Sequence, residues 1–303
     1  HQEQWLDRLE MEHGNLRMCL DFLTGTKVGL RMTSALHQFW YVHGHLEEGL
    51  YYMEKLMTHC HDATPKMQSS VLNGMGVFAW GRGEYQRAET YLRSALEYPY
   101  ALQDPIGIAG LHNNIGLLAQ LQGNFSEAHK NLEQSVKIYR QLSHHRSLSA
   151  SLDNLAGVSI EIGEFVEAEN LLNECAILLN THVDSSIFAS MITHRAILAR
   201  RYHHIEEAQK LFIQALQIRH GLKASAEIAR ILLHLADIAR LHGHIPRAVV
   251  LCAAITRMTE IVGFRLASSE TKTLEQYLET GRRSLSISRF TNSWNRGYHS
   301  SIE

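Results

Sequence analysis

The chain contains little proline, little cysteine and no long apolar run, and each shortage excludes a class of protein. Only four of its 303 residues are proline, so helices can run without interruption. The four cysteines are far apart in sequence and form no Cys-x-x-Cys pair, which argues against a disulfide framework and favours a reducing compartment. No stretch approaches ~18 consecutive apolar residues, the length that a membrane span requires. The sequence therefore predicts a helical, cytoplasmic protein with no membrane partner.

Neither sign of charge dominates the composition. Lysine and arginine total 29, aspartate and glutamate total 31, and the formal net charge is -2. A protein whose main task is to neutralise phosphates would carry an excess of basic residues. We therefore expect no direct binding of nucleic acid by this chain. A hydrophobic content of 45% with 20% charged residues is typical of a folded protein.

The common signatures of catalysis and of nucleotide binding are also missing. The sequence has no Gly-x-Ser-x-Gly elbow, no His-Glu-x-x-His helix and no Gly-x-x-x-x-Gly-Lys-Ser/Thr phosphate loop. We therefore expect no enzyme activity in this chain. It begins at His1 without an initiator methionine or a signal-peptide pattern, so we expect it to be part of a longer protein.

What the sequence does contain is one short motif, repeated every forty residues. The motif is a glycine, a spacer, a bulky apolar residue, two further residues and an alanine. Its copies begin at Gly83, Gly123, Gly163, His203 and Gly243, and a looser copy begins at Gly44. A fixed period of this size indicates stacked supersecondary units, each too small to bury its own apolar face.

Apolar residues recur at helical spacing on both sides of each motif glycine, which predicts a pair of amphipathic helices in each unit. We expect helix pairs at residues 27–59, 65–98, 105–142, 146–180, 184–220 and 223–262. Terminal units must shield the open ends of such a stack. Residues 1–26 are the predicted N-terminal cap, with one helix over 2–23. Residues 263–303 are the predicted C-terminal cap, with helices over 268–283 and 286–296.

Single residues predict how the helices begin. Thr64 and Asp104 each place a capping side chain before a proline at the first helical position, and Asp184 can cap the first helix of the fifth unit. The fifth unit is the weakest, because His203 replaces its turn glycine and Arg195 stands at a normally apolar position.

Other residues predict how the two helices of a unit meet. Gly123 and Gly163 stand where a helix ends and the backbone needs a positive φ. Ala128 and Ala168 follow these glycines by five residues, and we expect both to be fully buried between paired helices. A larger side chain at either position would push the two helices apart.

This pattern resembles the tetratricopeptide repeat over residues 27–262. The small and apolar positions of that repeat match Met75-Gly76 with Ala88 and Leu92, Ile115-Gly116 with Ala128 and Leu132, and Leu155-Ala156 with Ala168 and Leu172. The departure is a period of forty residues instead of thirty-four. The resemblance implies an all-α fold, a right-handed superhelix (α-solenoid) of about six helix pairs with capping helices.

Other segments resemble the repeat region of large bacterial signal-transduction ATPases of the STAND class, which often carry a LuxR-type or AfsR-type DNA-binding domain. These segments are Trp5–Arg17, Phe39–Gly49, Arg247–Ala254 and Trp294–Gly297. In that family the repeats form the sensor arm. The resemblance therefore implies a sensor, and it implies that any ATPase activity lies in an upstream domain outside this chain.

In tetratricopeptide stacks the first helix of each pair lines the concave face, so its polar residues form the candidate groove. Nine residues before each turn come Gly74, Asn114, Asn154, His194 and His234. Three residues before each turn come Trp80, Gln120, Ile160, Arg200 and Arg240. The neighbouring Asn73, Asn113, Arg201 and Asp237 complete the predicted set.

These residue types suit a peptide or an acidic ligand. An asparagine amide offers donors and an acceptor, so it can pair with the N–H and C=O of a peptide backbone together. Arginine offers a planar fork for carboxylates or phosphates. The alternative interpretation is that Asn114 and Asn154 bond within the stack and that the arginines are solvated.

The chain has twenty histidines, and several lie close together in sequence: His43 and His45, His59 and His61, His144 and His145, His203 and His204, and His242 and His244. A closed zinc site needs four converging ligands, and no pair has a partner pair at the usual spacing. We therefore predict solvated or capping histidines, with no metal and no cofactor.

Three functional hypotheses follow. The first is a non-enzymatic sensor and interaction arm of a STAND-type bacterial regulator that binds a peptide, a protein or a small effector in its concave groove. The second is a free-standing scaffold that organises other proteins. The third is a metal-dependent activity that uses the histidines.

Overall fold

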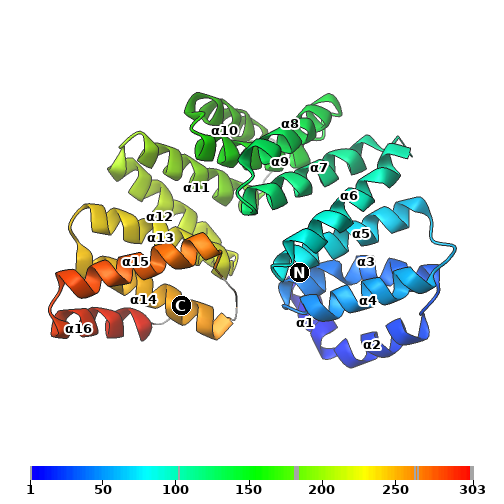
Figure 1. Ribbon diagram of the computed structural model, residues 1–303, viewed down its shortest axis with the longest axis horizontal. Helices are drawn as coiled ribbons and strands as arrows, with labels where there is room; N and C mark the ends of the chain where they lie inside the picture. The colour runs from blue at the N-terminus through cyan, green and yellow to red at the C-terminus, as the bar shows by residue number, and fades with distance from the viewer. Residues whose placement is uncertain (1, 102, 181–183, 263, 265, 301–303) are drawn as a thin grey trace. The chain divides into compact units, whose positions relative to one another are not determined.

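The computed structural model describes residues 2–101, 103–180, 184–262, 264 and 266–300, and these residues form sixteen α-helices with no strand among them. Figure 1 shows the helices in chain order from blue to red. They belong to two compact units, residues 1–162 and 163–303. Parts of the predicted terminal caps, residues 1, 263, 265 and 301–303, lie outside the described residues. None of the described helices combines the length and apolar composition needed to span a membrane.

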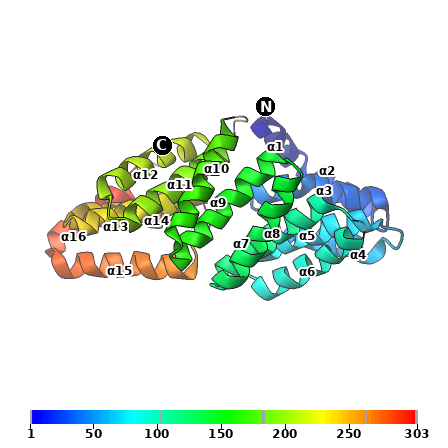
Figure 2. The ribbon, with the colours of Figure 1, turned by 90° about the horizontal axis from the view of Figure 1, so that it is seen from above.

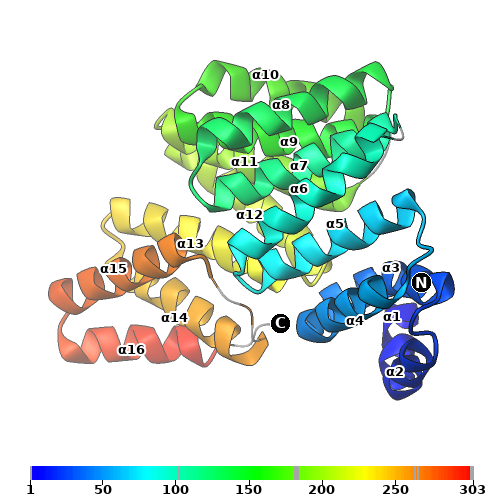
Figure 3. The same cartoon turned by 45° about the vertical axis from the view of Figure 1, so that its right-hand side comes forward.

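The first unit is a series of helix pairs. Its helices are α1 (Gln2–Met11), α2 (His13–Phe22), α3 (Lys27–Val42), α4 (Leu46–His59), α5 (Pro65–Gly81), α6 (Tyr85–Ala101), α7 (Pro105–Leu121), α8 (Phe125–Gln141) and α9 (His145–Ile162). Helix α3 pairs with α4, α5 with α6 and α7 with α8 (Figure 3). The first helices also contact one another, α3 with α5, α5 with α7 and α7 with α9, so they lie side by side in one layer.

The second unit continues the same construction and ends in two closing helices. Its helices are α10 (Phe165–Leu179), α11 (Ser185–Arg201), α12 (Ile205–Gly221), α13 (Ser225–Leu241), α14 (Ile245–Val262), α15 (Ser268–Ser284) and α16 (Ile287–Tyr298). Helix α11 pairs with α12 and α13 with α14. Helix α14 also packs against α15 and α16, which cover the end of the unit (Figures 1 and 2).

The predicted N-caps are confirmed. The side chain of Thr64 accepts a hydrogen bond from the backbone N–H of Met67, and that of Asp104 accepts one from Gly107. The carboxylate of Asp184 accepts two, from Ser186 and Ile187. Each cap satisfies backbone donors that have no partner within the first turn of the helix.

The turns between paired helices have the predicted left-handed residue. Gly123 has φ = 77° and Gly163 has φ = 87°, which confirms both predictions. His203, which replaces glycine in the fifth unit, adopts φ = 63° and keeps the same turn. A side chain at such a φ costs roughly 1–2 kcal/mol, so the unit keeps its geometry at some cost in stability.

Small residues allow the paired helices to approach closely. Ala128 and Ala168 are fully buried, as predicted, with 0% exposure each. A Cβ atom added to Gly116 would lie 2.7 Å from the side chain of Leu132, which is closer than Cβ atoms approach other heavy atoms in proteins. The tetratricopeptide-like positions therefore fix the distance between the two helices of a unit.

The N-terminal segment differs from the prediction of one helix over residues 2–23. It forms two helices, α1 and α2, with a break at Glu12, whose ψ of 7° departs from helical geometry. Gly14, a poor helix former, comes two residues after the break. The break turns α2 so that His13 and Leu20 are buried against the first repeat.

Candidate ligand-binding surface

Four asparagine side chains in the first unit join three first helices through hydrogen bonds. Asn154 of α9 donates to the side-chain oxygen of Asn113 of α7 over 3.0 Å. Asn114 of α7 donates to the side-chain oxygen of Asn73 of α5 over 2.8 Å. Within α7, the amide nitrogen of Asn113 lies 3.4 Å from the side-chain oxygen of Asn114, which links the two bonds. We call these four residues the asparagine chain.

The partners in the asparagine chain are shifted by one residue from the repeat. A row at forty-residue spacing would pair Asn154 with Asn114. The structure instead joins Asn154 to Asn113 and Asn114 to Asn73, residues that are 41 positions apart. Each bond therefore reaches the residue that precedes the equivalent position in the previous repeat.

Two serines support the asparagine chain through hydrogen bonds, and its four members remain half-buried. Ser151 donates to the side-chain oxygen of Asn113 over 3.2 Å, and the buried Ser135 lies 2.9 Å from Ser151. All four asparagines keep part of their surface exposed. An amide carries two N–H donors and two acceptor lone pairs, so these bonds use only part of its capacity. The asparagines therefore bond within the stack and still offer polar groups at the surface.

Trp80 and Gln120 lie further along the same first helices. Each follows an asparagine by seven residues, which is two helical turns: Trp80 follows Asn73 on α5, and Gln120 follows Asn113 on α7. Both side chains are half-buried, and Trp80 packs against the apolar cluster that contains Leu92. Gln120 therefore adds a polar group, and Trp80 a half-buried aromatic ring, near the ends of these first helices.

In the second unit two predicted arginines hold one aspartate. The carboxylate of Asp237 on α13 is 7% exposed and accepts hydrogen bonds from Arg200 of α11 and, over 2.8 Å, from Arg240 of α13. The guanidinium of Arg240 also lies 5.3 Å from the ring centroid of Tyr277 on α15. Asp237 thus orients both guanidinium groups, although 21% of the Arg200 side chain and 35% of the Arg240 side chain remain exposed.

This cluster shifts the ionisation of its members. Burial would raise the pKa of Asp237, but hydrogen bonds from Arg240 and Tyr277 and the charge of Arg200 outweigh it and hold the pKa below its usual value. Burial, with the bond to Asp237, raises the pKa of Tyr277 to about 12. At neutral pH the cluster therefore contains an ionised aspartate and an intact phenol.

His234, also predicted as a groove residue, is held in its neutral form. Burial lowers its pKa to about 4, and the charges of Arg200, His194 and Arg201 act in the same direction. Its ring stacks on Phe212 with centroids 4.9 Å apart. His234 therefore presents an uncharged, aromatic surface beside the charged cluster.

An open hollow of about 1250 Å³ lies beside the cluster. Its lining combines Asp237 and Arg240 of α13 with α15 residues that include Lys272, Gln276 and Tyr277. Tyr277 and Lys272 lie outside the predicted groove, because that prediction considers only the first helix of each pair and α15 was predicted as a closing helix. Tyr277 is the one aromatic residue in the sequence of α15, and this was the available signal.

The structure thus gathers the predicted residues into two groups, one in each unit. The asparagine chain, with Trp80 and Gln120, belongs to the first unit. Arg200, His234, Asp237 and Arg240 form the second group, with half-buried His194 and exposed Arg201 on the same α11 as Arg200. That one ligand contacts both groups stays a prediction.

Comparison with known proteins agrees with this architecture. The family model of the tetratricopeptide repeat matches residues 107–176, which include most of α7, all of α8 and α9, and most of α10. The tetratricopeptide-like helical repeat predicted from the sequence is therefore confirmed.

Several of the similar proteins are Rap proteins. The regulatory protein RapG of Bacillus subtilis (strain 168) is 26% identical over 144 residues, which cover 47% of this chain and 39% of RapG. The chain therefore matches less than half the length of that relative. The crystal structure of the apo form of RapI superimposes with a TM-score of 0.69 at 14% identity, covering 88% of this chain and 93% of RapI.

A further similar structure is the Rap conjugation gene regulator of the plasmid pLS20 in complex with the Phr* peptide. Its TM-score is 0.59 at 10% identity, over 88% of this chain and 76% of that protein. At such low identity the two structural similarities establish the fold alone: an all-helical, tetratricopeptide-like solenoid.

Proposed function

We propose that this chain is the non-enzymatic ligand-sensing and protein-interaction arm of a bacterial signal-transduction regulator. It binds a peptide, a protein or a small effector through the polar side chains of its first helices. The asparagine chain carries this proposal, because it aligns amide groups from α5, α7 and α9 on one layer. The similarity to a Rap regulator that was solved with a peptide supports the same class of ligand.

The spacing of the asparagine chain suits an extended peptide. Packed helices lie ~8–10 Å apart, and an extended peptide rises ~3.3 Å per residue, so successive first helices meet about every third residue of the ligand. Each asparagine can pair with a backbone N–H and C=O of the peptide together. In the second unit, Arg240 and Tyr277 offer charged and aromatic groups for a polar side chain or terminal carboxylate of a ligand.

The regulator itself is proposed to be of the STAND class, with a role in transcription regulation and a cytoplasmic location. Trp5–Arg17 and Phe39–Gly49 support this through their resemblance to the repeat region of that class. Any ATPase activity would then reside in an upstream domain of the same polypeptide. A free-standing interaction scaffold is the alternative. Sequencing the gene upstream of residue 1 separates the two, because only the first requires an upstream phosphate loop.

The proposal is tested by mapping a bound peptide. A library of random displayed peptides is selected on the purified chain, and one selected peptide is synthesised. Amide hydrogen exchange is then measured with and without the peptide. The proposal predicts slower exchange in residues 65–81, 105–121 and 145–162. Slower exchange confined to the second helices 85–101 and 125–141 would contradict it.

A further inference from the structure

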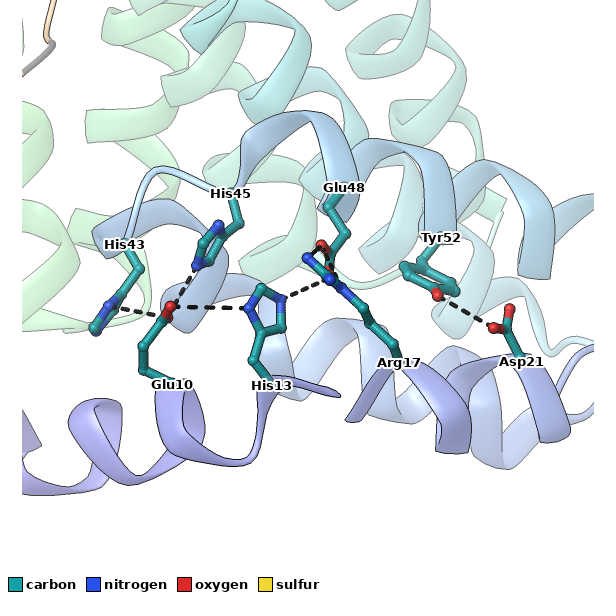
Figure 4. A network of polar contacts seen from close by, with 8 residues as sticks. All are labelled: Glu10, His13, Arg17, Asp21, His43, His45, Glu48 and Tyr52. Atoms are coloured by element: carbon teal, nitrogen blue, oxygen red, sulfur yellow. Dashed lines mark hydrogen bonds and ion pairs between the residues drawn. The ribbon is translucent and has the colours of Figure 1, made fainter. Parts of the chain in front are cut away.

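A cluster of histidines and carboxylates joins the N-terminal helices to the first repeat, and Figure 4 shows it from close by. The carboxylate of Glu10 on α1 lies between three imidazoles. Its oxygens are 2.9 Å from Nε2 of His45, 3.3 Å from Nδ1 of His43 and 3.9 Å from Nδ1 of His13. These residues come from α1, from α2 and from the turn between α3 and α4.

We propose that Glu10, His13 and His45 bind a zinc ion whose fourth position is taken by water. The ligand atoms of Glu10, His13 and His45 lie within 4.8 Å of one another, and no other group of three such residues does so among the described residues. The donor set of two imidazoles and one carboxylate is one that zinc accepts, with water as the fourth ligand.

The distances fit a tetrahedral ion. Zinc binds histidine nitrogen and carboxylate oxygen at ~2.0–2.2 Å, which places tetrahedral ligand atoms about 3.4 Å from one another. Oε2 of Glu10 lies 2.9 Å from Nε2 of His45, and Oε1 of Glu10 lies 3.9 Å from Nδ1 of His13, so the two separations lie on both sides of that value. The distance of 3.9 Å between Glu10 and His13 is too long for a hydrogen bond but suits two ligands of one ion.

His13 is already oriented as a metal ligand. Its Nε2 lies 2.7 Å from the carboxylate of Glu48, which can only accept, so Nε2 donates that hydrogen bond and Nδ1 lies on the side of Glu10. Arg17 holds the same carboxylate through Nε over 2.8 Å and through Nη2. A carboxylate behind a histidine is the usual way in which proteins fix the tautomer and direction of a metal-binding imidazole.

The buried ring of Phe39 supports the three imidazoles. Its centroid lies 5.3 Å from that of His13, 5.2 Å from His43 and 5.6 Å from His45. Phe39 is only 1% exposed, so the rings rest on a rigid apolar base. The side chains of His13, His43 and His45 are 11%, 21% and 27% exposed, so the cluster is partly enclosed yet open to an entering ion.

The chain contains a matched control for this site. His242 and His244 form the same His-Gly-His sequence in the turn between α13 and α14, and their rings stack at 6.4 Å with 9° between planes. His43 and His45 stack at 6.3 Å with 13° between planes. The difference is that α1 and α2 bring Glu10 and His13 to the first pair.

This cluster was not predicted from the sequence, because its two further members do not form a second pair of histidines at a fixed spacing. The missing ligands come instead from one residue on each side of the break at Glu12. In the proposed state the ion connects α1, α2 and the α3–α4 turn, and so fastens the N-terminal helices to the first repeat.

The test is calorimetric titration of the chelator-treated chain with Zn²⁺ at pH 7.5. We expect one Zn²⁺ per chain in a tight phase. His45→Gln and Glu10→Gln should weaken that phase at least tenfold, and Glu48→Gln by about 10–100-fold through the lost orientation of His13. The double variant His242→Gln with His244→Gln should bind as the wild type does.

The proposed site would be overturned if the tight phase persists in His45→Gln. It would also be overturned if the double variant at His242 and His244 loses the tight phase as fully as His45→Gln does. Circular dichroism of each variant shows whether the helices remain intact. A second readout does not depend on affinity: Co²⁺ bound to the wild type should give the visible absorption of a tetrahedral ion. An octahedral spectrum, or no tight phase in the wild type, would also overturn the proposal.

Discussion

The ion cluster around Asp237 should be a main source of stability in the second unit. Replacing Asp237 by alanine leaves Arg200 and Arg240 facing each other without their shared acceptor. Their Nε atoms are already buried without a hydrogen-bond partner among the described residues, so the truncation adds further unpaired donors. Removing one partner of a buried ion pair costs roughly 3–5 kcal/mol. The side chains of Arg200 and Arg240 are 21% and 35% exposed. Screening by solvent therefore reduces the expected loss of unfolding free energy to about 2–3 kcal/mol.

For a unit of this size, that loss lowers the melting temperature by about 6–9 °C. Thermal unfolding followed by far-ultraviolet circular dichroism measures it. Asp237→Asn, which keeps an acceptor oxygen without the charge, should lie between wild type and Asp237→Ala. Glu207→Ala, which removes an exposed carboxylate, should shift stability by less than about 0.5 kcal/mol. If the melting temperature of Asp237→Ala lies within a degree or so of that of the wild type, the ion cluster does not stabilise the second unit as predicted.

The pH dependence of the same variants gives a second measurement. The folded pKa of Asp237 lies below the ordinary value of 3.8, so its contribution is fully present above that value and is lost as pH falls through the folded pKa. Asp237→Asn should therefore lose less stability than the wild type on acidification below about pH 4. Parallel acid unfolding of the two proteins would contradict the assigned direction.

Three further outcomes are expected. Gly123→Val should lower the free energy of unfolding by more than ~1 kcal/mol, because Gly123 has a φ of 77°. Gly221→Val is the control: its added side chain is equally unobstructed, but Gly221 has no positive φ, so the loss should be smaller. Equal melting temperatures for the two variants would show that Gly123→Val introduces no backbone strain. Ala128→Leu should cost roughly 1–3 kcal/mol by overpacking a fully buried contact, and a neutral result in urea unfolding would count against it. The pKa of His234 is about 4 in the folded protein against an ordinary 6.5, so the wild type should lose stability as the pH falls from 6.5 to 4. In His234→Phe the free energy of unfolding should depend less on pH over this range.

The repeat and its turns could be predicted because they depend on residues that are local in sequence. Gly123 and Gly163 occupy the turns with positive φ, and Ala128 and Ala168 are buried, as their places in the motif require. Even the irregular copy at His203 keeps the turn, because the packing of two helices decides its backbone more strongly than the preference of one residue.

The side-chain partners could not be predicted, because they depend on how helices from different repeats are aligned. A forty-residue period gives the repeat positions, but the hydrogen bond from Asn154 reaches Asn113 through a shift of one residue. The break at Glu12 is a second example. One continuous helix would not have turned His13 toward Glu48, and nothing in the apolar pattern of residues 2–23 marks that break.

The proposed function requires that the asparagine chain contacts a peptide ligand. Calorimetric titration of the selected peptide into the wild type, Asn114→Ala with Asn154→Ala, and the exposed Asn170→Ala of α10 tests it most directly. Buried polar contacts are worth roughly 1–3 kcal/mol each, so the double variant should bind at least tenfold more weakly with unchanged helix content. Asn170→Ala should bind as the wild type does. Equal affinities for all three proteins would leave the asparagine chain with a structural role only and would contradict the account.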